Sequence, residues 1–115
     1  MNKTNVALAE AYYTAMGEKN VTDMEKYLHP DVRFIGPLAK ITGKEELLSA
    51  AKNFIALFKT LTIRALFGSE NQAMLAYDLD CPPPIGKLPV AALLTFQEGL
   101  IIEIELFVDG RPFER

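Results

Sequence analysis

The sequence contains few of the residues from which metal, disulfide and nucleotide sites are usually built. It has one cysteine, one histidine and no tryptophan in 115 residues. Because Cys81 has no partner for an intrachain disulfide and His29 has no second histidine, we expect neither a disulfide framework nor a zinc-ligand set. The pairs Gly43-Lys44 and Gly86-Lys87 are isolated, so no phosphate-binding loop is present. We therefore expect no metal and no organic cofactor.

Positive charge and long apolar runs are equally scarce. The chain has 12 Lys and Arg against 15 Asp and Glu, a net charge of −3, and its basic residues do not cluster. This balance argues against nucleic acid and anionic membranes as partners. No segment approaches the ~20 apolar residues that a transmembrane helix needs, and the N-terminus lacks a secretory core. Together with the single cysteine, these absences predict a cytoplasmic protein.

What the sequence does contain is enough apolar surface for one folded domain. Half of the residues are hydrophobic, and 115 residues is a typical domain length. No repeat, linker or low-complexity tract divides the chain, and the run Pro82-Pro83-Pro84 is typical of a stiff bend between strands. We therefore expect a single domain over residues 1–115.

Hydrophobic spacing and turn residues predict three helices and a mostly antiparallel sheet. Helical periodicity and capping-box patterns place helices at 4–17, at 22–28 and from Thr42 to about Lys59. Strand patterns cover 31–36, 61–67, 72–81, 88–96 and 100–108. Short turns make the last four strands an antiparallel meander, and the first strand must dock on one of its edges. The expected class is α+β, with a curved sheet wrapped around helices that cover one face.

Several local marks occur in the order typical of a known family. They are a Tyr-containing first helix, the segment Leu28–Phe34, Gly36-Pro37, the segment Gly43–Leu47 and the ending Gly99–Asp109. In the order and spacing of these marks, the chain resembles the SnoaL-like group of the nuclear transport factor 2-like superfamily. The resemblance implies a cone-shaped, curved mixed or antiparallel sheet around three N-terminal helices, an apolar pocket on its concave side, and frequent homodimers through its outer face. The fold hosts ketosteroid isomerases, polyketide cyclases, dehydratases and non-catalytic binding modules, so it does not choose a function.

Ketosteroid isomerase chemistry is incomplete in this sequence. That chemistry uses an Asp base beside the apolar pocket, with a Tyr and a neutral Asp as donors to the substrate oxygen. Tyr12 precedes Gly36 by a spacing similar to that between the tyrosine and the base in those isomerases. However, Gly36 resembles the base position and Ala92 the position of the donor Asp, and neither has an ionisable side chain. The sequence therefore argues against steroid-type isomerisation by that set of residues.

Asp78 is the candidate base, because Gly36 cannot serve as one. Asp78 and Asp80 lie two residues apart on one face of a strand, and analogy with the family would point both toward the concave side. An acid in an apolar cone can accept a proton, so Asp78 could act as base while the Tyr12 hydroxyl stabilises developing charge on an oxygen. With the faces reversed, Asp78 would be exposed, and Asp80 could instead lie at a solvated mouth. Whether Tyr12 or the adjacent Tyr13 faces inward stays open.

The other ionisable candidates fit structural roles better. Glu103 and Glu105 alternate with an apolar face that is better suited to line the pocket, so we expect both on the outer side of the sheet. His29 precedes Pro30 at a helix end, where an imidazole commonly binds exposed carbonyls.

We therefore predict a homodimer whose cone binds a small apolar or aromatic-like molecule. The expected pocket is lined mainly by apolar side chains, namely Phe34, Phe54, Phe58, Met74, Ala92, Leu94, Ile102, Ile104 and Leu106. If the protein is an enzyme, it should be a cofactor-independent isomerase, cyclase or dehydratase with Asp78 and Tyr12 as catalytic residues. The competing hypothesis is a non-catalytic homodimeric interaction module whose cone is plugged by Met16, Phe54 and Phe58. An empty cavity with an acid inside would favour the first hypothesis, and a plugged cone the second.

Overall fold

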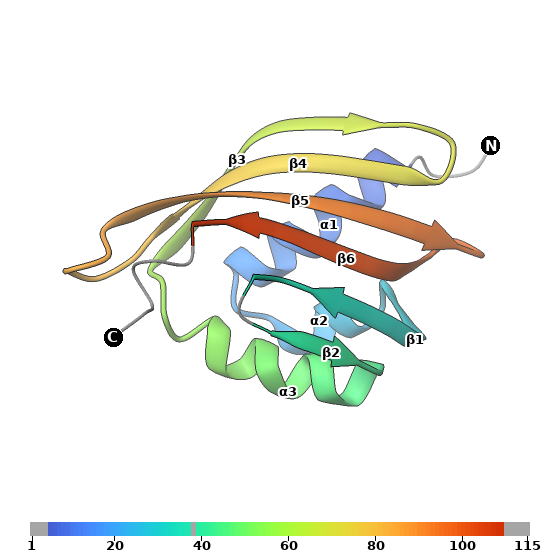
Figure 1. Cartoon of the computed structure of the whole chain (residues 1–115), viewed down its shortest axis with the longest axis horizontal. Helices are drawn as coiled ribbons and strands as arrows, with labels where there is room; N and C mark the ends of the chain where they lie inside the picture. Colours follow the sequence, from blue (N-terminus) through green and yellow to red (C-terminus); the bar gives the residue numbers. More distant parts are fainter. Residues whose placement is uncertain (1–4, 38, 110–115) are drawn as a thin grey trace.

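The structure, a computed structural model, describes residues 5–37 and 39–109. A strongly curved six-stranded sheet holds helices on its concave side, as Figure 1 shows. The helices are α1 (Asn5–Gly17), α2 (Val21–Glu25) and α3 (Lys44–Phe54). The strands are β1 (Leu28–Ile35), β2 (Lys40–Thr42), β3 (Thr60–Gly68), β4 (Gln72–Asp80), β5 (Lys87–Gln97) and β6 (Leu100–Val108). The predicted α+β class, with a curved sheet wrapped around helices, is confirmed.

The strand order in the sheet is β2-β1-β6-β5-β4-β3. The strands β3 to β6 form an antiparallel meander, and β1 runs parallel to β6 at its edge. The sequence predicts this docking of the first strand but misses β2, a three-residue strand that pairs antiparallel with the end of β1. The β1–β2 hairpin extends the sheet toward α3, so that α3 closes the open side of the cone.

Two boundaries near the start of the chain differ from the prediction. The side chain of Asn20 caps α2 by accepting a hydrogen bond from the Asp23 N–H (3.0 Å), so the predicted capping box does not form. β1 begins at Leu28, earlier than predicted. The reason is that the Ile101 N–H donates to the Tyr27 carbonyl (2.8 Å), which ties this segment to β6.

α3 is shorter than predicted at its C-terminal end. It begins after Gly43, which has a φ of 99° and provides no side-chain cap, because the first residue of the predicted capping box lies in β2. It ends at Phe54. The Lys19 ammonium donates hydrogen bonds to the carbonyls of Ile55 and Phe58, and it lies 4.2 Å from the centre of the Phe58 ring. This cation satisfies carbonyls beyond the helix end and holds the following segment in turns.

Register shifts account for the curvature of the sheet. One interrupts the pairing of β1 with β6, one the pairing of β3 with β4, and one the pairing of β5 with β6. Such bulges bend a strand and increase its twist. The long strands therefore curl over α1, and their inner face forms the wall of a cone (Figure 1).

Alternation along β4 defines the two faces of the sheet. Leu75, Tyr77 and Leu79 are buried and face the helices, whereas Met74 and Asp78 point to the convex side. Every helix among residues 5–37 and 39–109 is too short or too polar to span a bilayer.

Candidate functional site

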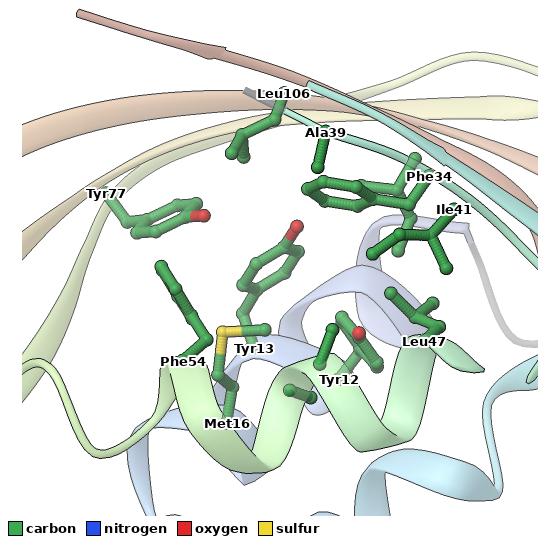
Figure 2. A pocket seen from close by; sticks show the side chains of 13 residues that line it. Tyr12, Tyr13, Met16, Phe34, Ala39, Ile41, Leu47, Phe54, Tyr77 and Leu106 are labelled. Atoms are coloured by element: carbon green, nitrogen blue, oxygen red, sulfur yellow. The ribbon is translucent and has the colours of Figure 1, made fainter. Parts of the chain in front are cut away.

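An apolar cavity of about 200 Å³ lies between α1, α3 and the concave face of the sheet, as Figure 2 shows. We call it the tyrosine chamber, because Tyr12 and Tyr13 of α1 and Tyr77 of β4 form part of its wall. The other lining residues are Met16, Phe34, Ala39, Ile41, Leu47, Ala50, Ala51, Phe54, Ile104 and Leu106. None of these side chains is ionised at neutral pH, so the wall is apolar apart from the phenol hydroxyls.

The three tyrosines form one contiguous cluster. The Tyr12 and Tyr13 rings meet edge-on with centroids 5.0 Å apart, and Tyr13 lies 4.9 Å from Tyr77 at an interplanar angle of 38°. The hydroxyls of Tyr13 and Tyr77 interact, and each shifts the pKa of the other. In Figure 2 both of these hydroxyls turn toward the interior of the chamber. They are therefore the polar groups that a bound molecule would meet there.

Burial keeps these hydroxyls protonated. Removal from water raises the pKa of Tyr12 and of Tyr13 well above the usual range, and the neighbouring tyrosines add to the rise. Burial also raises the pKa of Tyr77, although its interaction with the Tyr13 hydroxyl opposes the rise. At neutral pH each hydroxyl can donate a hydrogen bond to a ligand oxygen, but none is an ionised base.

A second apolar cavity, of about 190 Å³, adjoins the tyrosine chamber. We call it the aliphatic chamber. Its own wall consists of Gly36, Pro37, Leu57, Leu79, Leu88, Val90 and Val108. The two chambers share four lining residues, which are Phe34, Ala39, Phe54 and Leu106. These four side chains stand between the chambers and belong to both walls.

The structure brings five of the eleven expected site residues together. The wall of the tyrosine chamber contains Tyr12, Phe34, Phe54, Ile104 and Leu106. The sequence left open whether Tyr12 or Tyr13 faces inward. In the structure both of them line the chamber. Both are about 2% exposed, because the curled sheet and the other helices cover α1 on more than one side.

The other expected pocket residues lie elsewhere. Phe58, Ala92 and Leu94 are buried in the core but line neither chamber. Phe58 packs against Phe54, with ring centroids 5.7 Å apart, and so supports the wall from behind. The prediction for Met74 is wrong, because this side chain is 39% exposed on the convex face.

A register shift explains the error at Ile102. Ile101 pairs with Phe96 and Glu103 with Thr95, so Ile102 is the extra residue of a bulge. Ile101 is fully buried in the main core in its place. The prediction assumed uninterrupted alternation along the last strand, and the bulge breaks that alternation.

Asp78 lies on the face of β4 opposite the cavity. Its neighbour Tyr77 lines the tyrosine chamber, and alternation points the Asp78 carboxylate the other way. That carboxylate lies 3.4 Å from Arg64 Nε and 3.9 Å from Lys87 Nζ. The expectation that Asp78 faces the cone beside Tyr12 is therefore wrong. Catalytic roles for these two residues stay predictions.

The remaining ionisable candidates also lie outside both chambers. Asp80 is exposed at the end of β4. Glu103 accepts a hydrogen bond from Arg33 at 2.8 Å, and the Asp31 N–H donates to His29 Nδ1 at 3.0 Å. Among residues 5–37 and 39–109, no group of three His, Cys, Asp or Glu side chains is close enough to hold a metal ion.

Sequence reasoning missed Tyr77, although its pattern contained the signal. Leu75, Tyr77 and Leu79 alternate on the apolar side of β4, which is the side that packs on helices. Ile41 was missed because β2 was not predicted at all. Leu47 was expected on the buried stripe of α3 but was not assigned to the pocket.

Residues 9–104 match the family model of the SnoaL-like domain. Because this match spans most of the chain, the protein belongs to the SnoaL-like domain family. The resemblance found in the sequence is confirmed, and so is the nuclear transport factor 2-like fold.

Solved structures show the same fold at low sequence identity. A protein from Kribbella flavida has a TM-score of 0.90 at 21% identity, over 97% of this chain and 92% of that one. A protein of unknown function with the NTF2-like fold from Cytophaga hutchinsonii has a TM-score of 0.82 at 21% identity, over 98% of both chains. TerC, co-crystallised with polyporic acid, has a TM-score of 0.80 at 14% identity, over 95% of this chain and 94% of its own. No curated protein gives a significant match.

Proposed function

We propose that this protein binds a small, largely apolar or aromatic-like molecule in the tyrosine chamber. The observation that carries the proposal is an apolar cavity of about 200 Å³ whose polar groups are buried, neutral phenols. Apolar cavities of ~150 Å³ in proteins stay dry and accept a molecule the size of benzene. TerC, which shares the fold, was crystallised with polyporic acid, and this supports an organic ligand for such a cone.

The wall favours binding, or catalysis by hydrogen-bond donation, over proton abstraction. Its described residues include no carboxylate, imidazole or amine that could take a proton from a bound molecule. Any isomerisation, cyclisation or dehydration would rely on donors such as Tyr12 to stabilise charge on a ligand oxygen. Asp78 as base would have to act from the convex face, on the other side of the sheet from the chamber.

Titration with acetophenone, a single ring with one carbonyl acceptor, tests the proposal. Chemical-shift changes in a ¹⁵N-labelled sample should map to α1, α3 and the concave strands. Ala50→Leu should abolish binding because Ala50 lines the chamber, and cavity filling commonly stabilises the fold. Ser49→Leu is the matched control, since Ser49 is the exposed neighbour of Ala50 on α3 and lines neither chamber.

Two outcomes would overturn the proposal. One is the absence of any saturable shift with acetophenone and related single-ring probes. The other is equal binding by Ala50→Leu and the wild type, which would show that the probe occupies another part of the surface.

The homodimer remains part of the proposal and rests on the convex face. Phe67 is 69% exposed there, opposite the exposed Met74 of the neighbouring strand, and Phe107 is 45% exposed. Light scattering after size exclusion should give about twice 12.8 kDa, and Phe67→Ser should shift the mass toward one chain. A monomer at micromolar concentration would refute the dimer.

The non-catalytic interaction module is the second candidate. Its criterion is a plugged cone, and this criterion is met only in part. Met16 and Phe54 line the cone rather than fill it, and Phe58 stands behind the wall. A cavity is present, but it holds no acid. We retain the cytoplasm as the proposed location, since the chain's one cysteine, Cys81, is free and buried.

A further inference from the structure

The two chambers follow one another along the same elements. On β6, Ile104 lines the tyrosine chamber, Leu106 lines both chambers, and Val108 lines the aliphatic chamber. On β4, the order is Tyr77 and then Leu79. Because these residues follow at steps of two, the two chambers lie along one line of the concave face, which extends ~13 Å from Ile104 to Val108.

The tyrosine chamber and the aliphatic chamber follow one another in the same order along α3 and β1. On α3, Ala51 lines the tyrosine chamber and Phe54 lines both, while Leu57, just beyond the helix, lines the aliphatic chamber. On β1, Phe34 belongs to both walls, and Gly36 after the strand belongs to the aliphatic chamber alone. Four separate elements therefore agree on a single long axis.

The two ends of this axis differ in polarity. The tyrosine chamber has the hydroxyls of Tyr13 and Tyr77 turned into it (Figure 2). The wall of the aliphatic chamber consists of carbon side chains and backbone, Leu88 and Val90 among them. A ligand oxygen can find a donor at the first end, whereas at the second end it would lose its hydrogen bonds to water without replacement.

Phe34, Ala39 and Phe54 mark the passage between the two ends. They are shared by both walls, and Figure 2 shows Ala39 beside Phe34 at the side of the chamber opposite α1. Ala39 is exposed and is the smallest of these shared residues, so a chain of methylene groups can cross here only if position 39 stays small.

Building on the proposed function, we propose that the site takes an elongated, uncharged amphipathic molecule in one orientation. Its ring or head carries a carbonyl-type acceptor and lies in the tyrosine chamber, and an aliphatic tail passes Ala39 into the aliphatic chamber. An apolar cavity of ~150 Å³ accepts benzene, a six-carbon molecule, so the aliphatic chamber of about 190 Å³ has room for a tail of about four to six carbons.

A series of alkyl phenones from acetophenone to decanophenone tests the tail. Each buried methylene should tighten the dissociation constant about fourfold, from ~0.8 kcal/mol per group. The gain should stop once the tail exceeds about six carbons. Flat affinity across the series, with acetophenone still bound, would overturn the tail assignment and leave the proposed function standing. If no member binds, the proposed function fails and takes this assignment with it.

Blocking the passage tests the route of the tail. Ala39→Phe should weaken hexanophenone at least tenfold more than it weakens acetophenone, because Ala39 lines both chambers but only the longer ligand crosses position 39. Ala56→Phe is the matched control, since Ala56 is also exposed, follows α3 and lines neither chamber. Equal loss for both ligands, or equal loss in both variants, would overturn the route.

The orientation has a test that needs no substitution. Intermolecular nuclear Overhauser contacts should join the tail methyl of hexanophenone to the methyls of Val108 and Leu57, and the ring protons to Tyr13 and Tyr77. Hexylbenzene, which lacks the carbonyl, should show the same tail contacts with about fivefold to tenfold weaker binding. Reversed contacts, or tighter binding of hexylbenzene, would overturn the orientation.

Discussion

The concave and convex faces of the sheet are built from alternate residues of the same strands, yet their chemistry differs. On β4, Leu75, Tyr77 and Leu79 are each about 1% exposed and face the helices. Between them, Met74 is 39% exposed and the Asp78 carboxylate pairs with cations on the outside. The fold therefore keeps ionised groups on the convex face and presents only neutral hydroxyls to the cavity.

This difference indicates how each face can recognise a partner. An ionised group inside the cone would need a buried counter-charge, and the described wall has none. The concave face is limited to shape and neutral hydrogen bonds, whereas the convex face combines exposed aromatics with charge. Substitutions at adjacent residues that point to opposite faces can break or sharpen this comparison.

The largest expected contrast is between Leu75→Ala and Met74→Ala. Leu75 is buried in the core, so truncation should lower the free energy of unfolding by about 3 kcal/mol. Met74 is its exposed neighbour, and its truncation should cost less than about 1 kcal/mol in a monomer. Urea unfolding of both variants at low protein concentration measures the difference.

Equal losses for the two variants would contradict the division of the sheet into a buried and an open face. A cost for Met74→Ala that appears only at high protein concentration would sharpen it, because a second copy would then be covering the convex face.

Most of the fold follows from the sequence because its signals are local. The alternation along β4 and β5, and the short turn at Gly99, specify the meander without tertiary information. The early end of α3 does not follow, since it depends on Lys19, which is distant in sequence. The bulge that displaces Ile102 likewise depends on how β5 and β6 meet.

The site was less predictable, for a specific reason. Alternation shows that Tyr77 and Asp78 face opposite ways but does not by itself say which way is inward. The apolar neighbours Leu75 and Leu79 give the correct answer by burial, whereas analogy with family members that carry an acid in the cone gave the wrong one. Phe34, Phe54 and Leu106 line the tyrosine chamber, and in the sequence a single apolar stripe carries each of them.

After the contrast between Leu75→Ala and Met74→Ala, the second-largest effect is expected on stability at alkaline pH. Unfolded tyrosines titrate near pH 10, whereas burial raises the pKa of Tyr12, Tyr13 and Tyr77 in the folded state. Above that pH the native state therefore holds more protons than the unfolded state. The stabilisation is complete below pH ~10 and is lost as the pH rises, by about 1.4 kcal/mol per pH unit for each buried tyrosine.

Tyr12→Phe isolates one of these groups. Urea unfolding between pH 8 and 11 should show a shallower loss of stability in the variant, by about 1.4 kcal/mol per pH unit above pH 10. An unchanged slope would mean that Tyr12 titrates freely in the folded protein, which would contradict its place in a water-excluded wall.

Tyr77→Phe should have a smaller effect on stability and a clear effect on binding. The variant loses the interaction of the Tyr77 hydroxyl with Tyr13, which should lower the free energy of unfolding by no more than about 1 kcal/mol. It also loses a donor to the ligand, so acetophenone should bind about fivefold more weakly. Tyr27→Phe is the control, because Tyr27 lines neither chamber and its loss should leave the affinity unchanged.

The smallest effect is expected at the adjacent residue, in Asp78→Asn. The ion pairs of Asp78 are 3.4 and 3.9 Å long, and Arg64 and Lys87 are 54% and 76% exposed, so water screens them. Their loss should cost no more than about 0.5 kcal/mol, and less at high salt. Acetophenone affinity should not change, because the carboxylate lies across the sheet from the chamber. If Asp78→Asn altered this affinity more than Tyr77→Phe, the two faces would not act separately, and a role for Asp78 as the base would regain support.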